Sequence, residues 1–377
     1  MKKFLLLMVT LWLCVSCASA ETAVMLQAVN VGKADALILR CGTSTYLIDT
    51  GTRESWGSLS RALHGQGIDH LDGVILTHTD KDHGGGAWAL AQSSVRIDNW
   101  YASVWYTRKE KNHPGINAAA LRGQEVIWLQ QGMTLPLDGG SMTVLGPMYE
   151  DPDKENNNSV VLLVEAGGGR MLLTGDMELP EEKHLLTAGM IPTCDVLKVG
   201  NHGESDATSQ ALIDAVQPKI AVISTNTAEE PDTPAPRVLR LLQGAKVYQT
   251  QDAEAGVLVS ISGGTAQAEY LTDPELPPMP QGMQILAKGT DDSVRLRNGG
   301  SDSIDLTDWF LYSERGGETF VFPAGTVLET GQELTVVSLS SDGSGDFIWH
   351  EKKVWHKSKD DACVLQDPYG RVADRLE

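Results

Sequence analysis

Short apolar runs recur along the first two-thirds of the chain, and each is followed within two residues by a side chain that can bind a metal ion. These pairs are residues 46–48 before Asp49, 73–76 before His78, 171–175 before Asp176, and 196–201 before His202. Continuous apolar runs of this length are typical of buried strands. Helices are expected between them, at Ser58–His64, Gly86–Gln92, Pro180–Leu186, Ser209–Val216 and Pro234–Leu242. The pattern predicts mixed α/β layers with the polar residues on loops at strand ends.

The pattern changes after residue 272. Residues 273–282 are rich in proline and are typical of an extended, semi-rigid linker. Residues 283–377 show repeated short strands with Gly- and Asp-rich turns, which favours an all-β sandwich. Trp309 and Trp355 are expected in its core, and His350 and His356 at its surface.

The strongest chemical signal is the segment 77–86, Thr-His-Thr-Asp-Lys-Asp-His-Gly-Gly-Gly. His78, Asp80, Asp82 and His83 can all bind metal, because imidazole suits zinc and carboxylate oxygen suits harder ions such as manganese. The alternative is a charged, solvated loop that binds nothing. The density of ligands, together with the three other strand-end ligands, favours a two-metal site.

These motifs carry a family resemblance. The loop has the form His-x-Asp-x-Asp-His, and residues 29–36, 47–51, 173–176, 197–203 and 246–250 follow in the same order as in the family. Over residues 22–272 the chain resembles a metallo-β-lactamase-fold hydrolase of the ComEC competence-protein type. This resemblance implies an α+β fold, the αββα metallo-β-lactamase sandwich.

The C-terminal part resembles a second family. Residues 283–377 are similar to a lamin-tail domain, which implies an immunoglobulin-like β-sandwich. The matching features are Leu306-x-x-Trp309, Phe322-Pro323-Ala324-Gly325, Gly331, Trp355 and Leu365-x-Asp367-x-x-Gly370.

The first resemblance implies a role for each candidate ligand. His78 and Asp80 would hold one ion, and Asp82, His83 and His202 would hold the other. Asp176 would bridge the two ions, and Asp49 would orient a ligand from just outside them. Asp82, Asp176 and Asp49 are thus the expected catalytic residues. The cofactors would be two divalent ions, Zn or Mn, and a metal-bound hydroxide would be the nucleophile.

The chain also departs from the family pattern. The Gly-His-Thr motif of many members is replaced here by residues 154–159, so Asn156 and Asn158 are expected either to tie down their loop or to contact substrate. One of two adjacent histidines of the competence type is Asn201, and a later His-Pro is Thr233-Pro234. These losses leave the catalytic strength of the site open.

Other charged residues near the motifs have simpler interpretations. Lys81 is a candidate contact to a substrate phosphate. His113, in the basic segment 108–113, is interpreted as part of an exposed loop, and Lys198 as the partner of a buried carboxylate.

The first residues indicate export. Residues 1–20 have a basic start, an apolar stretch and Ala18-Ser19-Ala20, as in a signal peptide cleaved after Ala20. The alternative is lipid attachment at Cys17. No later stretch is long enough for a membrane helix. Cys41, Cys194 and Cys363 are too few for a disulfide framework. The expected location is therefore secreted or on the cell surface.

Three functions remain open on these grounds. The first is an exported phosphodiesterase or nuclease, with extracellular DNA as the candidate substrate. The second is a metallohydrolase of carboxylic esters, lactones or cell-wall phosphoesters. The third is a surface binding protein with a degenerate site. The formal net charge of −20 argues against broad, nonspecific binding of nucleic acid, which needs a basic face.

Overall fold

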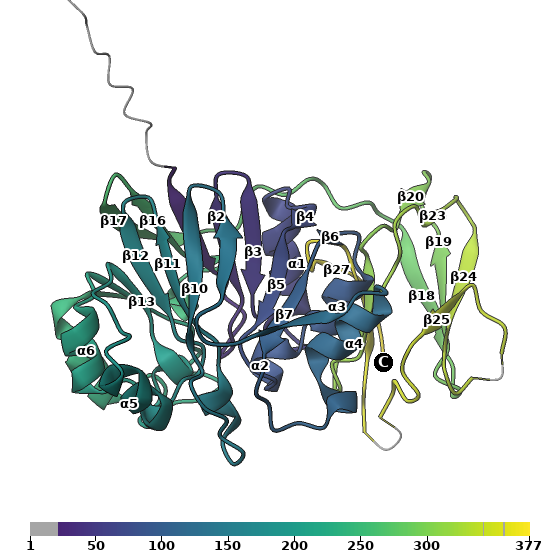
Figure 1. The fold of residues 1–377 in the computed structure, drawn as a ribbon. Coiled ribbons are helices and arrows are strands. Elements are labelled where there is room, and N and C mark those ends of the chain that lie inside the picture. Colours follow the sequence, from purple (N-terminus) through teal and green to yellow (C-terminus); the bar gives the residue numbers. More distant parts are fainter. Residues whose placement is uncertain (1–21, 342, 357–358) are drawn as a thin grey trace, which may run out of the picture.

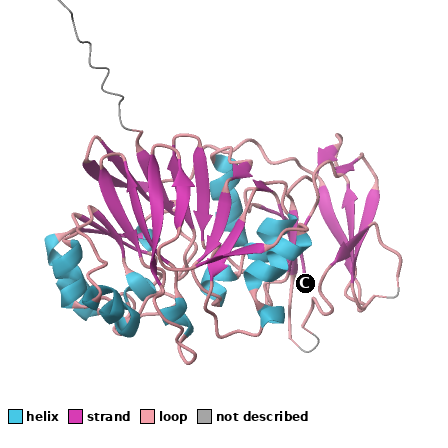
Figure 2. Cartoon of the chain, viewed as in Figure 1, coloured by secondary structure: helices cyan, strands magenta, loops and turns pink. Residues whose placement is uncertain are grey.

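The computed structural model describes residues 22–341, 343–356 and 359–377. The signal peptide expected at 1–20, with Ala20 and Cys17, lies outside these residues. Within them, two large β-sheets pack face to face with helices on their outer sides, and a smaller β-sandwich follows (Figures 1 and 2). No helix in this part of the chain has the length and apolar character needed to cross a membrane.

The first sheet has the strand order β17-β16-β1-β2-β3-β5-β7-β8. From β3 to β8 its strands are parallel, with Ile48 in register with Ile75. The carboxyl ends of β3 and β5 therefore lie side by side, which brings Asp49 next to the loop at 77–83. The bounds are β1 (Val24–Ala28), β2 (Leu37–Cys41), β3 (Ser44–Ile48), β5 (Gly73–Leu76), β7 (Trp100–Ser103), β8 (Val126–Leu129), β16 (Gly256–Ser262) and β17 (Thr265–Leu271), with a separate small pair β4 (His70–Leu71) and β6 (Arg96–Ile97).

The second sheet has the order β15-β14-β13-β12-β11-β10-β9. Strands β12 to β15 are parallel, so the segments that carry Asp176 and His202 leave adjacent strands at one edge. The bounds are β9 (Thr134–Leu137), β10 (Gly140–Gly146), β11 (Val161–Ala166), β12 (Gly169–Leu173), β13 (Val196–Lys198), β14 (Ile220–Ile223) and β15 (Lys246–Gln249).

Helices cover the outer face of each sheet, and an apolar core fills the space between the sheets. All five expected helices are present, with ends shifted by one or two residues. The expected αββα arrangement is confirmed. The bounds are α1 (Trp56–Gly65), α2 (Lys81–Gly84), α3 (Ala87–Gln92), α4 (Pro114–Leu121), α5 (Leu179–Thr187), α6 (Gln210–Val216) and α7 (Pro236–Leu241), with 3₁₀ turns η1 (Glu110–Asn112), η2 (Glu155–Asn158), η3 (Gly200–Gly203), η4 (Leu242–Gly244) and η5 (Thr250–Asp252).

The interpretation of His113 as part of an exposed loop is wrong. The residue is 1% exposed and begins the unexpected helix α4, where its Nδ1 accepts a hydrogen bond from the Ile116 N–H at 3.2 Å. Its ring packs edge-on against Tyr106 and Trp128. Proline at the first helical position and the alanines that follow favour the helix. The charged residues of 108–112 concealed this signal.

This burial makes acid stability depend on His113. Burial lowers the pKa of His113 to about 4, from an ordinary value near 6.5. The unfolded chain therefore binds the proton first, and the stabilising contribution, full above pH 6.5, is lost as pH falls toward 4. We expect the wild type to lose about 2 kcal/mol more unfolding free energy between pH 7 and 5 than His113→Asn, which retains a capping oxygen. Urea unfolding at both pH values measures this; equal losses would contradict it.

The C-terminal module (residues 283–377, the sandwich) has two four-stranded sheets, β18-β19-β24-β25 and β22-β21-β26-β27, around one apolar core. Trp309 is 2% exposed in that core, and Trp355 packs against it. His350 and His356 are exposed, as expected. The bounds are β18 (Met283–Lys288), β19 (Val294–Asn298), β20 (Ile304–Asp305), β21 (Phe310–Ser313), β22 (Thr319–Val321), β23 (Val327–Leu328), β24 (Glu333–Ser338), β25 (Phe347–Trp349), β26 (Cys363–Gln366) and β27 (Val372–Leu376).

The sandwich packs against the helices of the first sheet (Figure 1). Phe310 and Val321 belong to the same buried apolar cluster as Trp56. The buried Asp308 accepts a hydrogen bond from the Ser94 N–H at 2.6 Å. The two modules therefore share a packed interface with specific polar contacts.

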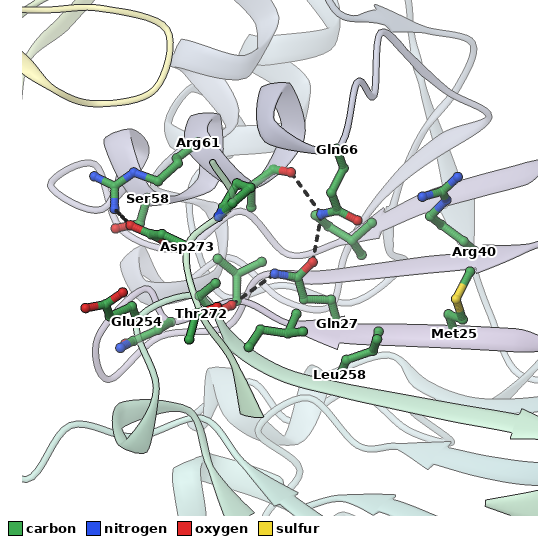
Figure 3. A pocket seen from close by; sticks show the side chains of 17 residues that line it. Met25, Gln27, Arg40, Ser58, Arg61, Gln66, Glu254, Leu258, Thr272 and Asp273 are labelled. Atoms are coloured by element: carbon green, nitrogen blue, oxygen red, sulfur yellow. Dashed lines mark hydrogen bonds and ion pairs between the residues drawn. The ribbon is translucent and has the colours of Figure 1, made fainter. Parts of the chain in front are cut away.

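The linker is also held against the first module. Asp273 pairs with Arg61 of α1 at 2.7 Å (Figure 3). A mainly apolar cavity of about 260 Å³ lies here, between β1, α1 and the start of the linker. Its lining contains none of the candidate metal ligands.

Candidate metal centre

The candidate ligands come from strand ends of both sheets. Asp49 follows β3 with a φ of +60°, and the loop at 77–83 follows β5. The loop lies directly on the neighbouring segment, because the Thr50 N–H donates to the His83 carbonyl at 2.6 Å. Glycine is required at 86, since a Cβ there would lie 2.3 Å from the Thr50 carbonyl oxygen. The Gly-Gly-Gly run thus permits the close approach of these two segments.

Four of the predicted ligands form one cluster. The ligand atoms of Asp82, His83, Asp176 and His202 all lie within 4.8 Å of one another. Asp176 Oδ2 lies 3.0 Å from His83 Nε2 and 3.3 Å from His202 Nε2. The second oxygen of Asp176 is buried and has no hydrogen-bond partner among the described residues. Asp176 is therefore the centre of the cluster.

The other two predicted ligands lie beside this cluster. The rings of His78 and His83 have centroids 4.1 Å apart. His78 Nε2 lies 3.8 Å from Asp80 Oδ2, so these two side chains can face a second ion. Asp80 is 37% exposed and also accepts a hydrogen bond from Arg108 Nη2 at 3.0 Å.

Hydrogen bonds fix which ring nitrogen faces the cluster. His202 Nδ1 lies 2.9 Å from the Ser224 carbonyl, which can only accept, so Nδ1 donates. His83 Nδ1 lies 2.7 Å from Asp49 Oδ2. The Thr77 hydroxyl donates to the same Asp49 oxygen at 2.7 Å and is left to accept from His78 Nδ1 at 3.1 Å. Three Nε2 lone pairs therefore point at the cluster, as in sites where outer partners orient histidine ligands.

The residues fit a divalent metal. The Nε2 atoms of His78, His83 and His202 are buried and lack hydrogen-bond partners in the part of the chain that the structure describes. Unsatisfied buried polar atoms are costly, and several aimed at one point indicate a missing ligand. Imidazole nitrogens mixed with carboxylate oxygens suit zinc or manganese.

The electrostatics of the cluster also favour a cation. Burial opposes a charged His202, yet the Asp176 carboxylate raises the pKa of His202 to about 9. Burial opposes ionisation of Asp176 too, but His202 and His83 bring the pKa of Asp176 well below its ordinary value. Protons and metal ions therefore compete for the same nitrogen atoms, and metal binding releases protons.

Of the three residues predicted to contact substrate, Lys81 is exposed, whereas Asn156 and Asn158 make hydrogen bonds within the protein. Lys81 is exposed at the start of α2, between Asp80 and Asp82. Asn158 uses its amide within its own loop, accepting from the Asp151 N–H and donating to the Asp151 carbonyl, both at 2.9 Å. Asn156 donates to Glu178 at 3.1 Å.

Sequence reasoning missed three supporting residues. Glu155 accepts from the Thr79 N–H at 2.9 Å and the Thr107 N–H at 2.6 Å, and so joins two loops beside the site. The Ser159 hydroxyl accepts from the Asp176 N–H at 3.1 Å, and Ser224 offers only its backbone carbonyl to His202. No sequence signal marks a backbone acceptor. Glu155 lies in the segment 154–159, where only Asn156 and Asn158 were considered as functional residues.

Comparison with known proteins agrees with this geometry. Residues 29–227, more than half of the chain, match the family model of the Metallo-beta-lactamase superfamily. The chain belongs to the metallo-beta-lactamase superfamily. Residues 278–377 match the Lamin Tail Domain.

Within the metallo-beta-lactamase superfamily, the chain is similar to proteins named for competence. It is 30% identical over 272 residues to ComE operon protein 3 of Bacillus subtilis (strain 168), covering 67% of this chain and 34% of that protein. It is 27% identical over 246 residues to Competence protein ComA of Neisseria gonorrhoeae, covering 64% and 33%. The chain thus spans about a third or less of the length of the curated relatives it matches.

A solved metallo-beta-lactamase-fold structure is also similar. Zn(2+)-bound PqqB from Methylobacterium extorquens is 14% identical, with a TM-score of 0.44, over 63% of this chain and 99% of that one.

A buried ion pair lies beside the candidate metal site of this metallo-beta-lactamase domain. Lys198 Nζ lies 2.7 Å from Asp35 Oδ2, and both side chains are almost fully buried. This confirms the expected pairing of Lys198. The Asp35 N–H also donates to the Asp82 carbonyl at 3.0 Å. The pair therefore connects β13, which leads to His202, with the loop at 77–83.

We expect Lys198→Met to lower the unfolding free energy by about 3–5 kcal/mol, because it leaves the Asp35 charge buried and unpaired. Lys219→Met is the matched control, since Lys219 pairs with Asp195 at the same 2.7 Å but is 67% exposed. That change should cost at most about 1 kcal/mol. The double variant Asp35→Leu/Lys198→Met should recover most of the loss. Urea unfolding measures all four proteins, and equal costs for the two Lys variants would contradict the assignment.

Proposed function

We propose that this protein is an exported, binuclear metal-dependent hydrolase that cleaves phosphodiesters, with DNA as its leading substrate. The observation that carries the proposal is the convergence of the buried Nε2 atoms of His83 and His202 on the Asp176 carboxylate, with His78 Nε2 buried beside Asp80. Export rests on the sequence of residues 1–20.

The proposed ligand sets are those that the family resemblance implies, and the cluster of Asp82, His83, Asp176 and His202 is compatible with them. Asp82, His83 and His202 would hold one ion, His78 and Asp80 the other, and Asp176 would contact both. Two such ions would supply Lewis acidity for the reacting phosphoryl oxygen and would activate water. Asp49 acts through His83 and is a positioning residue.

Residues around the centre favour a phosphodiester over a neutral ester. Arg108 donates to Asp80 at 3.0 Å, and Lys81 is exposed one residue from two ligands. Guanidinium and ammonium groups are the usual partners of phosphate oxygens. Relatives named for competence and for recombination, processes that involve DNA, support the same choice.

The acidic character of the chain is compatible with this proposal. Part of the net charge of −20 belongs to the metal centre itself, where Asp80, Asp82 and Asp176 would be neutralised by bound ions. Affinity for a polyanion would then come from the ions and a few local cations rather than from a broad basic face.

The test combines metal content and activity. The full chain is stripped and reloaded with Zn or Mn, and metals are counted by mass spectrometry. Single- and double-stranded DNA and bis(p-nitrophenyl) phosphate are then assayed. We expect about two ions per chain and cleavage of all or some of these substrates. In Asp82→Ala, metal content should fall and kcat/KM should drop by about 100-fold or more, since each ion supplies several kcal/mol of transition-state stabilisation.

Asp98→Ala is the control. Asp98 belongs to a second, more exposed group with His70 and Asp72 that could bind a metal adventitiously. This change should leave activity and the two ions of the centre intact. Two ions without any phosphodiesterase activity would contradict the proposed substrate and direct the search to carboxylic esters and lactones. A chain that binds no metal would contradict the hydrolase and favour a binding protein.

A further inference from the structure

A pocket of about 380 Å³ adjoins the metal centre and is built by both modules. Its lining includes Arg53, Lys81 and Arg108, the acids Glu54 and Asp80, and Gly316 of the sandwich. We call it the basic pocket. Three cations converge there in a chain whose formal net charge is −20.

Two of these cations are incompletely neutralised. The Lys81 ammonium makes no hydrogen bond or ion pair with any described residue, and Lys81 is exposed. Arg108 uses Nη2 on Asp80, but its Nε is buried and has no hydrogen-bond partner within the described residues. A buried guanidinium nitrogen without an acceptor is costly, and the exposed Lys81 ammonium is a usual partner of phosphate oxygens.

The pocket adjoins the candidate metal ligands, and Asp80 belongs to both. Lys81 lies in sequence between Asp80 and Asp82, and Arg108 contacts Asp80 directly. The three cations are not themselves metal ligands. Lys81 is therefore available to an anionic group beside the reacting group, while Arg53 and Arg108 each already pair with one carboxylate.

The sandwich shapes the far wall of the pocket. Gly316 and Gly317 lie in the turn between β21 and β22. The turn lies against the first module so closely that a Cβ on Gly317 would be 2.9 Å from the Arg53 Cβ and 2.8 Å from Glu54 Oε1. Glu351, also in the sandwich, pairs with Arg53 at 3.6 Å. The sandwich therefore fixes the position of Arg53.

We infer that the basic pocket binds the phosphate next to the one being cleaved, so that the substrate is a nucleic acid strand rather than an isolated phosphodiester. This inference rests on the proposed phosphodiesterase activity. A strand carries a phosphate at every nucleotide, and contacts to neighbouring phosphates position it without reading its sequence. The lamin tail domain thus forms part of the substrate site.

The first experiment compares two substrates and two arginines. Arg53→Gln removes a pocket cation, and Arg170→Gln is the matched control, because the side chains are 46% and 45% exposed and each pairs with one glutamate. Values of kcat/KM are measured for an oligothymidine and for bis(p-nitrophenyl) phosphate over a range of salt concentrations. We expect Arg53→Gln to lower kcat/KM for the oligonucleotide about tenfold more than for the aryl diester. The slope of log kcat/KM against log salt should become shallower by about 0.7, as for one lost phosphate contact on a single strand.

The second experiment addresses the sandwich. Gly316→Asp and Gly316→Asn add side chains of nearly the same size and meet the same Glu318 carboxylate. Only the first adds negative charge to the pocket wall. We expect Gly316→Asp to lower oligonucleotide kcat/KM several-fold below Gly316→Asn, and both thermal melting temperatures are measured to exclude unfolding.

The results distinguish failure of the pocket's phosphate-binding role from failure of the phosphodiesterase activity. If the wild type cleaves both substrates and the variants change the two rates equally or not at all, the phosphate-binding role of the basic pocket is wrong. The proposed phosphodiesterase activity then stands. A metal-loaded wild type that cleaves neither substrate overturns the phosphodiesterase and this inference with it.

Discussion

The ion pair between Lys198 and Asp35 joins the two halves of the candidate metal site. Lys198 is the last residue of β13 in the second sheet, and Asp35 precedes β2 in the first. Burying either charge without its partner would cost several kcal/mol of folding free energy, because the site excludes water. The pair forms only if the two sheets keep their separation and register. The Asp35 N–H also donates to the Asp82 carbonyl, so the loop at 77–83 of the first sheet is connected to β13, the strand that precedes His202 in the second. The geometry around Asp176 depends on this connection.

Much of this arrangement could be predicted from the sequence, for identifiable reasons. The runs 46–48, 73–76 and 171–173 are continuous and apolar, and 196–198 departs from this only at the paired Lys198, because parallel strands are buried on both faces. A ligand that follows such a run must lie at a sheet edge. The order of these runs and the spacing of 78–83 carried the family resemblance, and that resemblance implied the fold and which residues meet.

Other parts could not be predicted, because they depend on contacts between distant segments. His113 lies in a charged segment, yet it is buried by Tyr106 and Trp128 from elsewhere in the fold. The carbonyl of Ser224 orients His202, and any residue could supply a carbonyl. The contact of the sandwich with Arg53 depends on how two modules dock, which no local pattern records. Sequence patterns and the family resemblance therefore indicated the candidate ligands and the orienting Asp49, but not the Ser224 carbonyl or the wall of the neighbouring pocket.

The direction of β1 determines which edge of the first sheet lies near the N-terminal end of the described chain. Strands β1 and β2 are antiparallel, as are β2 and β3, so β1 runs parallel to β3. The start of β1 at Val24 and the Asp49 end of β3 therefore lie at opposite edges of the sheet (Figure 1). A tether attached ahead of β1, whether lipid or peptide, would hold the domain by the edge remote from its metal centre. The edge that carries the candidate ligands would then point away from the anchoring surface.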